Sequence, residues 1–281
     1  MTLVESATTP HRGSAPMGRL LGAELRWVLR RPRTLVMLGL FALVPILIAI
    51  GVVVADRGGG GLIGAIAGNG LVLPVAAMTL MLALLLPLAV GMAAADAIAG
   101  EAAHGTLRGL LLAPVGRGRL VLMKAFGVLV VAVTATLIVA VVGVIAGLVV
   151  VGGADGTLVT LSGTTLGFGE AMGRVGIAAL WTVGQLAAVG AIALAISAFT
   201  EHPLVVLASV LGGLIVFGVL GAIPALDWLQ PYLLTTGFSA GADVLRDPMT
   251  WGELGSSTLR ALCYVAIGGG ITASRMLTRD A

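Results

Sequence analysis

The stretch ADAIAGEAAHGTLRGLLLAPVGRGRLVLMK, residues 95–124, is a long polar interruption between two strongly apolar blocks. The block before it, 71–95, and the block after it, 121–151, are each long enough for the roughly 20 residues that a helix needs to cross a bilayer. The polar stretch is therefore expected to emerge at a membrane surface, with the rest of the chain arranged as spans on either side of it.

The composition of the whole chain points to the same class. Of its 281 residues, 58% are hydrophobic and only 10% are charged, and the mean hydropathy is +1.11. These values predict an integral membrane protein. No basic face with interleaved aromatic residues occurs, so a nucleic-acid partner is not expected. The single cysteine, Cys263, cannot form a disulfide within the chain.

Six apolar blocks predict an all-α fold with six transmembrane helices. The blocks lie within a transmembrane domain of 34–275, near 34–55, 71–95, 121–151, 175–199, 204–222 and 258–274. Gly143 and Gly147 form a G-x-x-x-G pair inside the third block, where we expect close contact with another helix.

The segments outside this domain differ in composition. Residues 1–16 are rich in Ser, Thr and Pro and predict a disordered cytoplasmic tail, and 276–281 form a second short tail. In 17–33, one helix face would be basic and the other apolar, with Arg19, Arg26, Arg30 and Arg33 opposite Leu21, Leu25, Val28 and Leu29. This pattern predicts an interfacial helix along the inner leaflet. The alternative is a basic stop before the first span.

The distribution of basic residues predicts the orientation. With both termini and the 96–124 loop in the cytoplasm, twelve of the 16 Lys and Arg residues lie inside, and four lie outside, namely Arg57, Arg174, Arg246 and Arg260. Such an excess of positive charge inside predicts cytoplasmic N and C termini in a multi-pass protein of a bacterial-type plasma membrane.

The polar stretch has the parts of a rigid, charged connector. Asp96 and Glu101 can begin a short helix, where carboxylates favour the positive end of the helix dipole, and Gly105 is placed to end it. Thr106 can cap the next turn, and Pro114 breaks the leucine-rich run that follows. The second half is basic, with Arg108, Arg117, Arg119 and Lys124. These residues fit anionic headgroups or an acidic groove of a partner, or are the positive flanks that membrane helices ordinarily carry.

The order of these residues resembles a known family. E-x-x-x-G-T-L-R from Glu101, then L-L-x-x-P-x-x-R-x-R and Lys124, is similar to the cytoplasmic loop after the second membrane helix in permeases of the ABC-2 exporter class. The resemblance implies that 96–120 is a coupling loop whose short helix docks on a separate ATP-hydrolysing subunit. It assigns this contact to Asp96, Glu101, His104, Gly105, Thr106, Arg108, Pro114 and Arg117.

The same resemblance extends to the assembly. It implies that 17–33 is the elbow helix that precedes the first span in ABC-2 permeases. It also implies that two permeases, identical or related, assemble in the bilayer with two ATPase subunits, which carry the ATP and Mg.

A segment predicted to lie outside, 223–257, contains Trp228, Pro231, Tyr232 and Trp251 among scattered acids. It resembles the external region between the last two spans of ABC-2 permeases, which packs over the translocation path as a lid. An interfacial belt, with the three aromatic side chains at headgroup depth, is the alternative.

Catalysis by this chain alone is not expected. No G-x-x-x-x-G-K-[ST] occurs, so the chain has no P-loop of its own. The histidines His11, His104 and His202 lie in separate segments without the spacing of metal ligands. We therefore expect no enzyme activity, cofactor or metal on this chain.

The predicted spans are nearly free of the ionisable groups that ion-coupled carriers need. Energy for uphill transport would then come from another subunit. An apolar path suits an apolar or amphipathic cargo, and the candidate polar contacts along it are Thr134, Thr136, Thr182 and Gln185. For the threonines the alternative is a hydrogen bond to a carbonyl of their own helix.

Together these features predict the membrane subunit of an exporter for a drug, peptide or lipid-like substrate, driven by ATP hydrolysis on a partner. Two alternatives stay open. A non-transporting scaffold or sensor would use the loop as a regulatory docking patch, and a channel or uniporter would need no ATPase.

Overall fold

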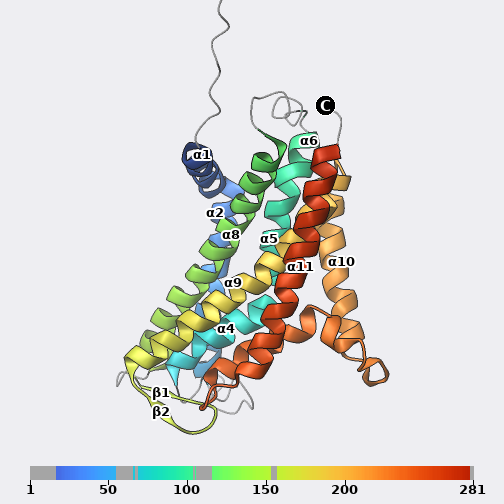
Figure 1. Ribbon diagram of the computed structural model, residues 1–281. Coiled ribbons are helices and arrows are strands. Elements are labelled where there is room, and N and C mark those ends of the chain that lie inside the picture. The colour runs from blue at the N-terminus through green and yellow to red at the C-terminus, as the bar shows by residue number, and fades with distance from the viewer. Residues whose placement is uncertain are drawn as a thin grey trace, which may run out of the picture.

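A computed structural model describes residues 17–54, 66, 69–103, 105, 116–152 and 157–278. Helices dominate these ranges and run along one another as a bundle (Figure 1). Helix α1, the short helix α6 and the last turn of α11 lie at one end, here named the α1 end, and the β1–β2 hairpin lies at the opposite, hairpin end. The tail predicted at 1–16 and most of the loop at 104–115 fall outside the described residues.

The first two helices are separated by one residue. Helix α1 spans Met17–Arg30 and α2 spans Pro32–Val54, with Arg31 between them. Proline disfavours helical backbone at the residue before it and is well suited to the first position of a new helix, so Pro32 ends one helix and begins the next. The amphipathic segment predicted at 17–33 is therefore a helix that ends at Arg30, set at an angle across the α1 end (Figure 1).

The apolar block predicted as one span at 71–95 is two helices. A 3-10 turn, Gly70–Val72, leads into α4, Leu73–Leu82, and α5 follows as Leu85–Ala95. The break falls at Ala83 and Leu84, where Leu84 leaves the helical conformation with φ −149° and ψ −51°. Pro87 explains it, because proline lacks the N–H that would bond the carbonyl four residues earlier, at Ala83, and its ring clashes with that carbonyl.

The remaining long helices follow the other apolar blocks. They are α8 (Arg117–Ala146, extended by the π-helical turn Gly147–Val151), α9 (Phe168–Phe199), α10 (Pro203–Gly221) and α11 (Trp251–Thr278). Between α8 and α9 lies an antiparallel hairpin of β1 (Leu158–Val159) and β2 (Thr165–Leu166), with Leu158 opposite Leu166. Short 3-10 turns at Pro224–Leu226 and Gln230–Tyr232 and a longer one at Thr235–Leu245 connect α10 to α11.

Five helical stretches of the described chain are long and apolar enough to cross a membrane. They are Pro32–Val54, Leu85–Ala103, Arg117–Val151, Phe168–Phe199 and Pro203–Gly221. The sixth predicted span, 258–274, lies inside α11, which packs along α9. Polar residues such as Ser257 and Arg260 dilute the apolar character of α11, so six spans stay a prediction.

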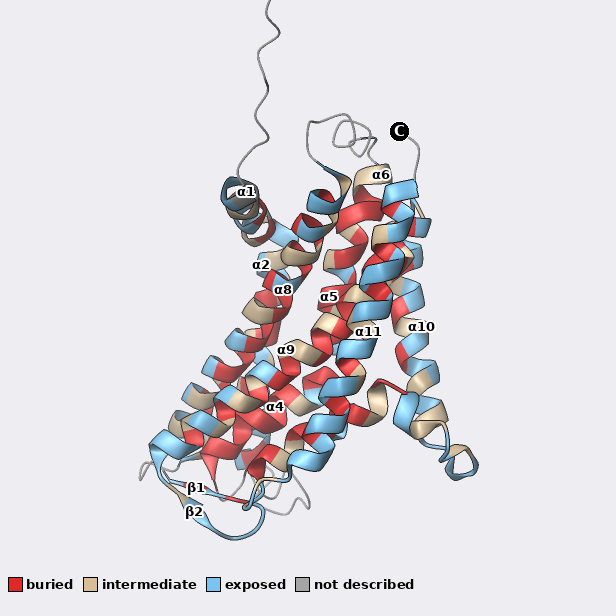
Figure 2. Ribbon diagram, in the orientation of Figure 1, coloured by how far each residue is buried: buried red, intermediate tan, exposed pale blue. Residues whose placement is uncertain are grey.

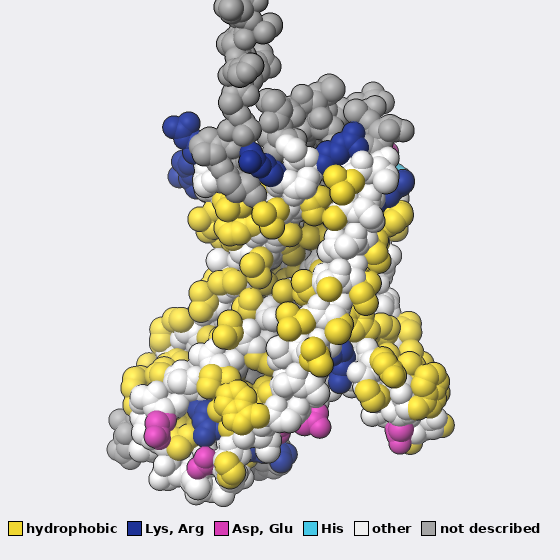
Figure 3. Space-filling view, in the orientation of Figure 1, with side chains coloured by type: hydrophobic (Ala, Val, Ile, Leu, Met, Phe, Trp, Pro, Cys, Tyr) yellow, Lys and Arg dark blue, Asp and Glu magenta, His cyan; other side chains and the backbone are white. Residues whose placement is uncertain are grey.

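The helices differ in how much of their surface the bundle covers. In the most apolar part of α9, 67% of residues are buried, against 28% in α2 and 11% in α10 (Figure 2). Exposed leucines and valines cover α2 and α10, as suits contact with lipid or with another membrane subunit. Figure 3 shows hydrophobic side chains over the middle of one face, Lys and Arg side chains at the α1 end, and side chains of both signs at the hairpin end.

Glycines allow α8 to approach the segment that begins α4. A Cβ at Gly143 would lie 2.7 Å from the Cα of Pro74, and a Cβ at Gly147 would lie 2.0 Å from the carbonyl oxygen of Gly70. The predicted helix contact of this G-x-x-x-G pair is confirmed, because a side chain at either position would collide with backbone.

We expect Gly143→Ala to lower the free energy of unfolding by about 1–3 kcal/mol, the usual range for overpacking a core. Gly176→Ala is the matched control, because nothing lies within 4 Å of a Cβ at that position of α9. Thermal unfolding of the detergent-solubilised protein measures both. Equal melting midpoints for the two variants would contradict the close approach of α8 and α4.

Candidate functional site

Five charged residues gather at the α1 end, and we name them the charge cluster: Glu24 of α1, Arg31, Asp96, Glu101 and Lys124 of α8. The Nζ atom of Lys124 lies 2.5 Å from Oε1 of Glu101 and 3.6 Å from Oε1 of Glu24. An Nη1 atom of Arg31 donates to Oδ2 of Asp96 at 3.0 Å. The cluster therefore links the two N-terminal helices to both ends of the polar stretch at 95–124.

The start of the polar stretch continues from α5. Asp96–Gly100 forms a π-helical turn, and α6, Glu101–Ala103, follows without interruption. The N–H of Ala99 donates to Oγ of Ser197 at 2.9 Å, which attaches the turn to α9. Gly105 adopts φ 71°, a left-handed conformation that glycine tolerates best, and its N–H donates to the carbonyl of Ala102 at 3.0 Å. Glu101 is thus held on a helix that is continuous with α5.

Because these side chains are buried, each charged group depends on an oppositely charged neighbour for its stability. Lys124 is 4% exposed and Glu24 is 8% exposed. Burial raises the pKa of Glu24 above its ordinary value, and the charge of Lys124 opposes this shift. Burial also lowers the pKa of Arg31, against the attraction of Asp96. Removing one partner from such a buried pair typically costs about 3–5 kcal/mol, because the other charge stays in a poorly solvated site.

The structure places four of the eight residues assigned to the coupling contact. Asp96 and Glu101 belong to the charge cluster, and Gly105 ends the short helix. Arg117 begins α8, and its Nη1 donates to the carbonyl of Leu277 at 2.8 Å, which joins α8 to the end of α11. His104, Thr106, Arg108 and Pro114 lie outside the described residues.

Sequence reasoning placed Lys124 in the polar stretch, but it did not predict that Lys124, Glu24 and Arg31 would pair with the acids of this cluster. Two signals were available. Glu24 is the one acid within the basic segment 17–33, and Lys124 is the one lysine among the 16 Lys and Arg residues of the chain. A long flexible ammonium suits a position between two carboxylates better than the planar guanidinium that the rest of the chain uses.

Of the four residues named as polar contacts of a substrate path, three are buried inside the bundle and Thr134 is partly buried. Thr134 donates to the carbonyl of Val130 in its own helix at 2.7 Å, which is the alternative predicted for a buried threonine. Thr136, Thr182 and Gln185 are each at most 1% exposed. In the described part of the chain, the hydroxyl of Thr136 and both amide atoms of Gln185 have no hydrogen-bond partner.

Close contacts place these buried polar groups at one depth. Gly190 of α9 packs on Val128 of α8 and Val90 of α5. Helix α9 runs opposite to α8, so Thr182, eight residues before Gly190, lies level with Thr136, eight residues after Val128. Helix α5 runs in the direction of α9, so Gln185, five residues before Gly190, lies level with the beginning of α5, next to the break at Ala83 and Leu84. The polar groups therefore lie at the depth where the helix that leads to the charge cluster begins.

The segment 223–257, which was predicted to lie outside, packs on the bundle in one part and is exposed in another. Three predicted lid residues are largely exposed, Trp228 at 70%, Tyr232 at 67% and Trp251 at 63%, and Pro231 lies in the turn beside Tyr232. The part that packs inward is the 3-10 turn Thr235–Leu245, where Phe238 and Leu245 are buried. Arg260 of α11 holds the start of this turn by donating to the carbonyl of Leu233 at 2.5 Å.

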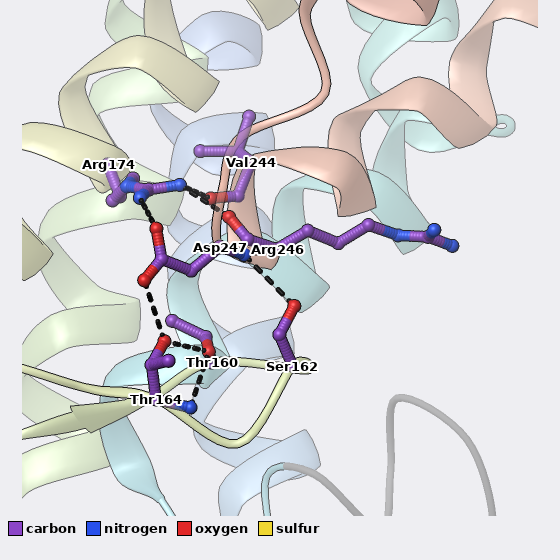
Figure 4. Close-up of polar contacts among 7 residues, drawn as sticks. All are labelled: Thr160, Ser162, Thr164, Arg174, Val244, Arg246 and Asp247. Carbon is purple, nitrogen blue, oxygen red and sulfur yellow. Dashed lines mark hydrogen bonds and ion pairs between the residues drawn. The ribbon is translucent and has the colours of Figure 1, made fainter.

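A polar clasp at the hairpin end joins three segments (Figure 4). Arg174 of α9 donates to the carbonyls of Val244 and Arg246 at 2.9 and 2.7 Å and forms an ion pair of 3.3 Å with Asp247. The other carboxylate oxygen of Asp247 accepts from the Thr164 hydroxyl at 2.9 Å, which brings in the hairpin. The clasp fixes the end of the inward-packed turn against both α9 and the hairpin.

Comparison with known proteins identifies the family. A model described as ABC-2 family transporter protein matches residues 19–240, well over half of the chain. The chain belongs to the ABC-2 transporter family. The match begins within α1 and includes the polar stretch, so the permease resemblance of that stretch is confirmed. The family is one of membrane-embedded permeases that work with ATP-hydrolysing subunits. A comparison with curated proteins gave no match.

Gln185 and Trp181, one helical turn apart on α9, provide a test of the buried polar groups in this ABC-2 permease. The indole N–H of Trp181 donates to Oγ of Ser257 at 3.1 Å, whereas the Gln185 amide has no described partner. Trp181→Phe should therefore lower the free energy of unfolding by about 1 kcal/mol or more, and Gln185→Leu should leave it unchanged or raise it. A clear loss of thermal stability in Gln185→Leu would show that its amide is satisfied by a ligand or water.

The raised pKa of Glu24 predicts how stability changes with pH. Between the ordinary glutamate pKa and the raised one, the folded protein binds more protons than the unfolded chain, so stability falls as pH rises through this window. Glu24→Gln should remove this part of the pH dependence. Melting midpoints measured from about pH 5 to about pH 8 should therefore be flatter in Glu24→Gln than in the wild type. Parallel curves would contradict the assignment.

Proposed function

We propose that this chain is the permease subunit of an ATP-binding-cassette exporter, with ATP and Mg bound by separate subunits that dock on the 96–120 loop at the α1 end. The observation that carries the proposal is the charge cluster. It connects the beginning of this loop, through Glu101 and Lys124, to the helix that resumes after the loop. A force applied to the loop would therefore reach two membrane helices through one buried ion pair.

The route of such a force follows the contacts of α6. The π-helical turn joins α6 directly to α5, and the bond from Ala99 to Ser197 extends the route to α9. Lys124 carries it to α8, and Glu24 carries it to α1. The break at Ala83 and Leu84 is the place where α5 can tilt while α4 stays packed on α8.

The cargo is proposed to be apolar or amphipathic, such as a drug, a peptide or a lipid-like molecule. Apart from residues near their ends, helices α2, α5, α8, α9 and α10 offer no Asp, Glu, Lys or Arg along their lengths. A small hydrophilic ion would find no counter-charge there. The largely exposed surface of α10 suits assembly with a second permease. For export from the cytoplasm or inner leaflet, the α1 end is proposed to be cytoplasmic.

A scaffold, a sensor or a channel without an ATPase would share the fold, but it would not need rigid links from the loop to four helices. The experiment that separates them is co-purification of the tagged protein from detergent-solubilised membranes, with the co-purifying subunits identified by mass. A P-loop ATPase in the complex would support the exporter. Its absence from intact complexes would favour the scaffold or channel.

Neutralising the buried lysine tests the coupling role. We expect Lys124→Gln to lower the ratio of transported cargo to hydrolysed ATP by about tenfold in vesicles that contain the complex, since about 1.4 kcal/mol of lost coupling changes a population tenfold. The swapped pair Glu101→Lys with Lys124→Glu should recover part of the ratio. Arg26→Gln is the matched control, because Arg26 is an exposed cation on α1 that bonds only its own helix in the described chain.

The interpretation of a lower transport ratio depends on how much of the complex assembles. If Lys124→Gln assembles with the ATPase in normal amount and keeps the wild-type ratio, the charge cluster has no coupling role. If the variant does not assemble, the swapped pair still tests the proposal, because restoring the pair between positions 101 and 124 should restore part of the assembly, with Glu24 opposing the new carboxylate at 124.

A further inference from the structure

A groove at the α1 end lies between α1, the beginning of α2, α5 and α8, beside the charge cluster. We name it the inner groove. Its walls come from Glu24 and Val28 on α1, from Arg33 and Met37 on α2, from Ala93 on α5 and from Val131 on α8, among others. Arg33 of α2 and Met92 of α5 are its exposed lining residues, so the inner groove is open to the surroundings of the bundle on this side, while buried residues such as Ala89 and Val131 line its depth.

The inner groove is polar at one end and apolar at the other. Asp96 and Lys124 line its charged end. Ala89, seven residues before Asp96, and Val131, seven residues after Lys124, line its apolar end. With a rise of 1.5 Å per residue, the walls extend about 10 Å from the charges into the apolar part of the bundle. A ligand that fits both ends has a charged head and a hydrocarbon chain.

The sign of the head follows from the charges at the mouth. The carboxylates that line it are Glu24 and Asp96, and both already have cationic partners. Arg33 is exposed at the mouth, and no carboxylate of the described residues lies within ion-pair distance of it. The positive charge of Arg33 also disfavours the charged form of Arg31, which lines the same mouth. An anion between the two guanidinium groups would relieve this repulsion.

We propose that the inner groove binds one anionic phospholipid from the leaflet on the α1 side, with its phosphate between Arg31 and Arg33 and an acyl chain along Met37, Ala93 and Val131. The exposed residues Arg26 and Arg30, in the half of α1 that is nearer to Arg31, add to the positive potential that draws anionic lipid to this end. The bound lipid contacts α1, α2, α5 and α8 together, so it stabilises the arrangement of the elbow-like helix against the bundle. This site does not depend on whether the chain transports anything.

The experiment compares lipids that differ in head or tail. Purified protein in detergent is titrated with phosphatidylglycerol, with phosphatidylcholine of the same acyl chains, and with soluble glycerol phosphate, and retained lipid is counted by native mass spectrometry alongside the melting midpoint. Phosphatidylglycerol should be retained as one tightly held molecule and should raise the midpoint more than phosphatidylcholine. Glycerol phosphate, which lacks the tails, should do neither.

One variant changes the charged end of the groove, and a second changes the apolar end. Arg33→Gln should weaken retention of phosphatidylglycerol about fivefold, the loss expected for one cation that faces an anionic headgroup, and should leave phosphatidylcholine unaffected. Ala93→Phe should fill the apolar part and remove the tightly held molecule of phosphatidylglycerol. Arg19→Gln is the matched control, because it removes an exposed cation of α1 that does not line the groove, and it should bind as the wild type does.

Three results would overturn the proposal. Equal retention of the two phospholipids would show ordinary lipid contact with the bundle. The same stabilisation by glycerol phosphate would show a site for soluble anions instead of a lipid. Unchanged binding in both Arg33→Gln and Ala93→Phe, with Arg19→Gln weakened, would place the lipid elsewhere on α1.

Discussion

An ammonium group that is almost completely buried is stable only where carboxylates lie within reach, and Lys124 has two of them. Glu101 belongs to the loop that precedes α8, and Glu24 belongs to the N-terminal helix. Neither α6, which carries Glu101, nor α1 can move far from α8 without leaving a charge unsatisfied in a poorly solvated place. The arrangement of the α1 end therefore depends on this triad, and the ion pair of Arg31 with Asp96 adds a second attachment at the same level.

The packing changes along the bundle: close backbone contacts hold α8 against α4, and a break separates α4 from α5. Gly143 and Gly147 fix α8 against Pro74 and Gly70 through backbone contacts that permit no side chain. Pro87 interrupts the helix that leads from α4 toward the loop. In the proposed mechanism, a displacement at the α1 end would change the tilt of α5 while the α4–α8 contact, close to the hairpin end, stays closed. The Arg174 clasp keeps that end together (Figure 4).

Apolar runs were enough to locate most helices, because a helix in hydrocarbon must satisfy its backbone internally and its length is set by the bilayer. The family followed from the spacing of Glu101, Gly105 and the basic residues after them. What sequence patterns could not give was pairing across the bundle. Glu24 and Lys124 are distant in the chain, and the spacing of charges within one helix does not show which carboxylate a lysine meets. The inward-packed turn Thr235–Leu245 was missed because the exposed aromatic residues on either side of it gave the stronger signal.

The charge cluster and the inner groove share Arg31, Lys124, Glu24 and Asp96, so they cannot act independently. An anion between Arg33 and Arg31 would compete with Asp96 for the guanidinium of Arg31, and Asp96 begins the turn that carries Glu101. Residues that share partners in one network show coupled energies. It follows from both proposals that lipid occupancy of the groove and the position of the 96–120 loop would be linked, with each state of the loop binding the lipid to a different extent.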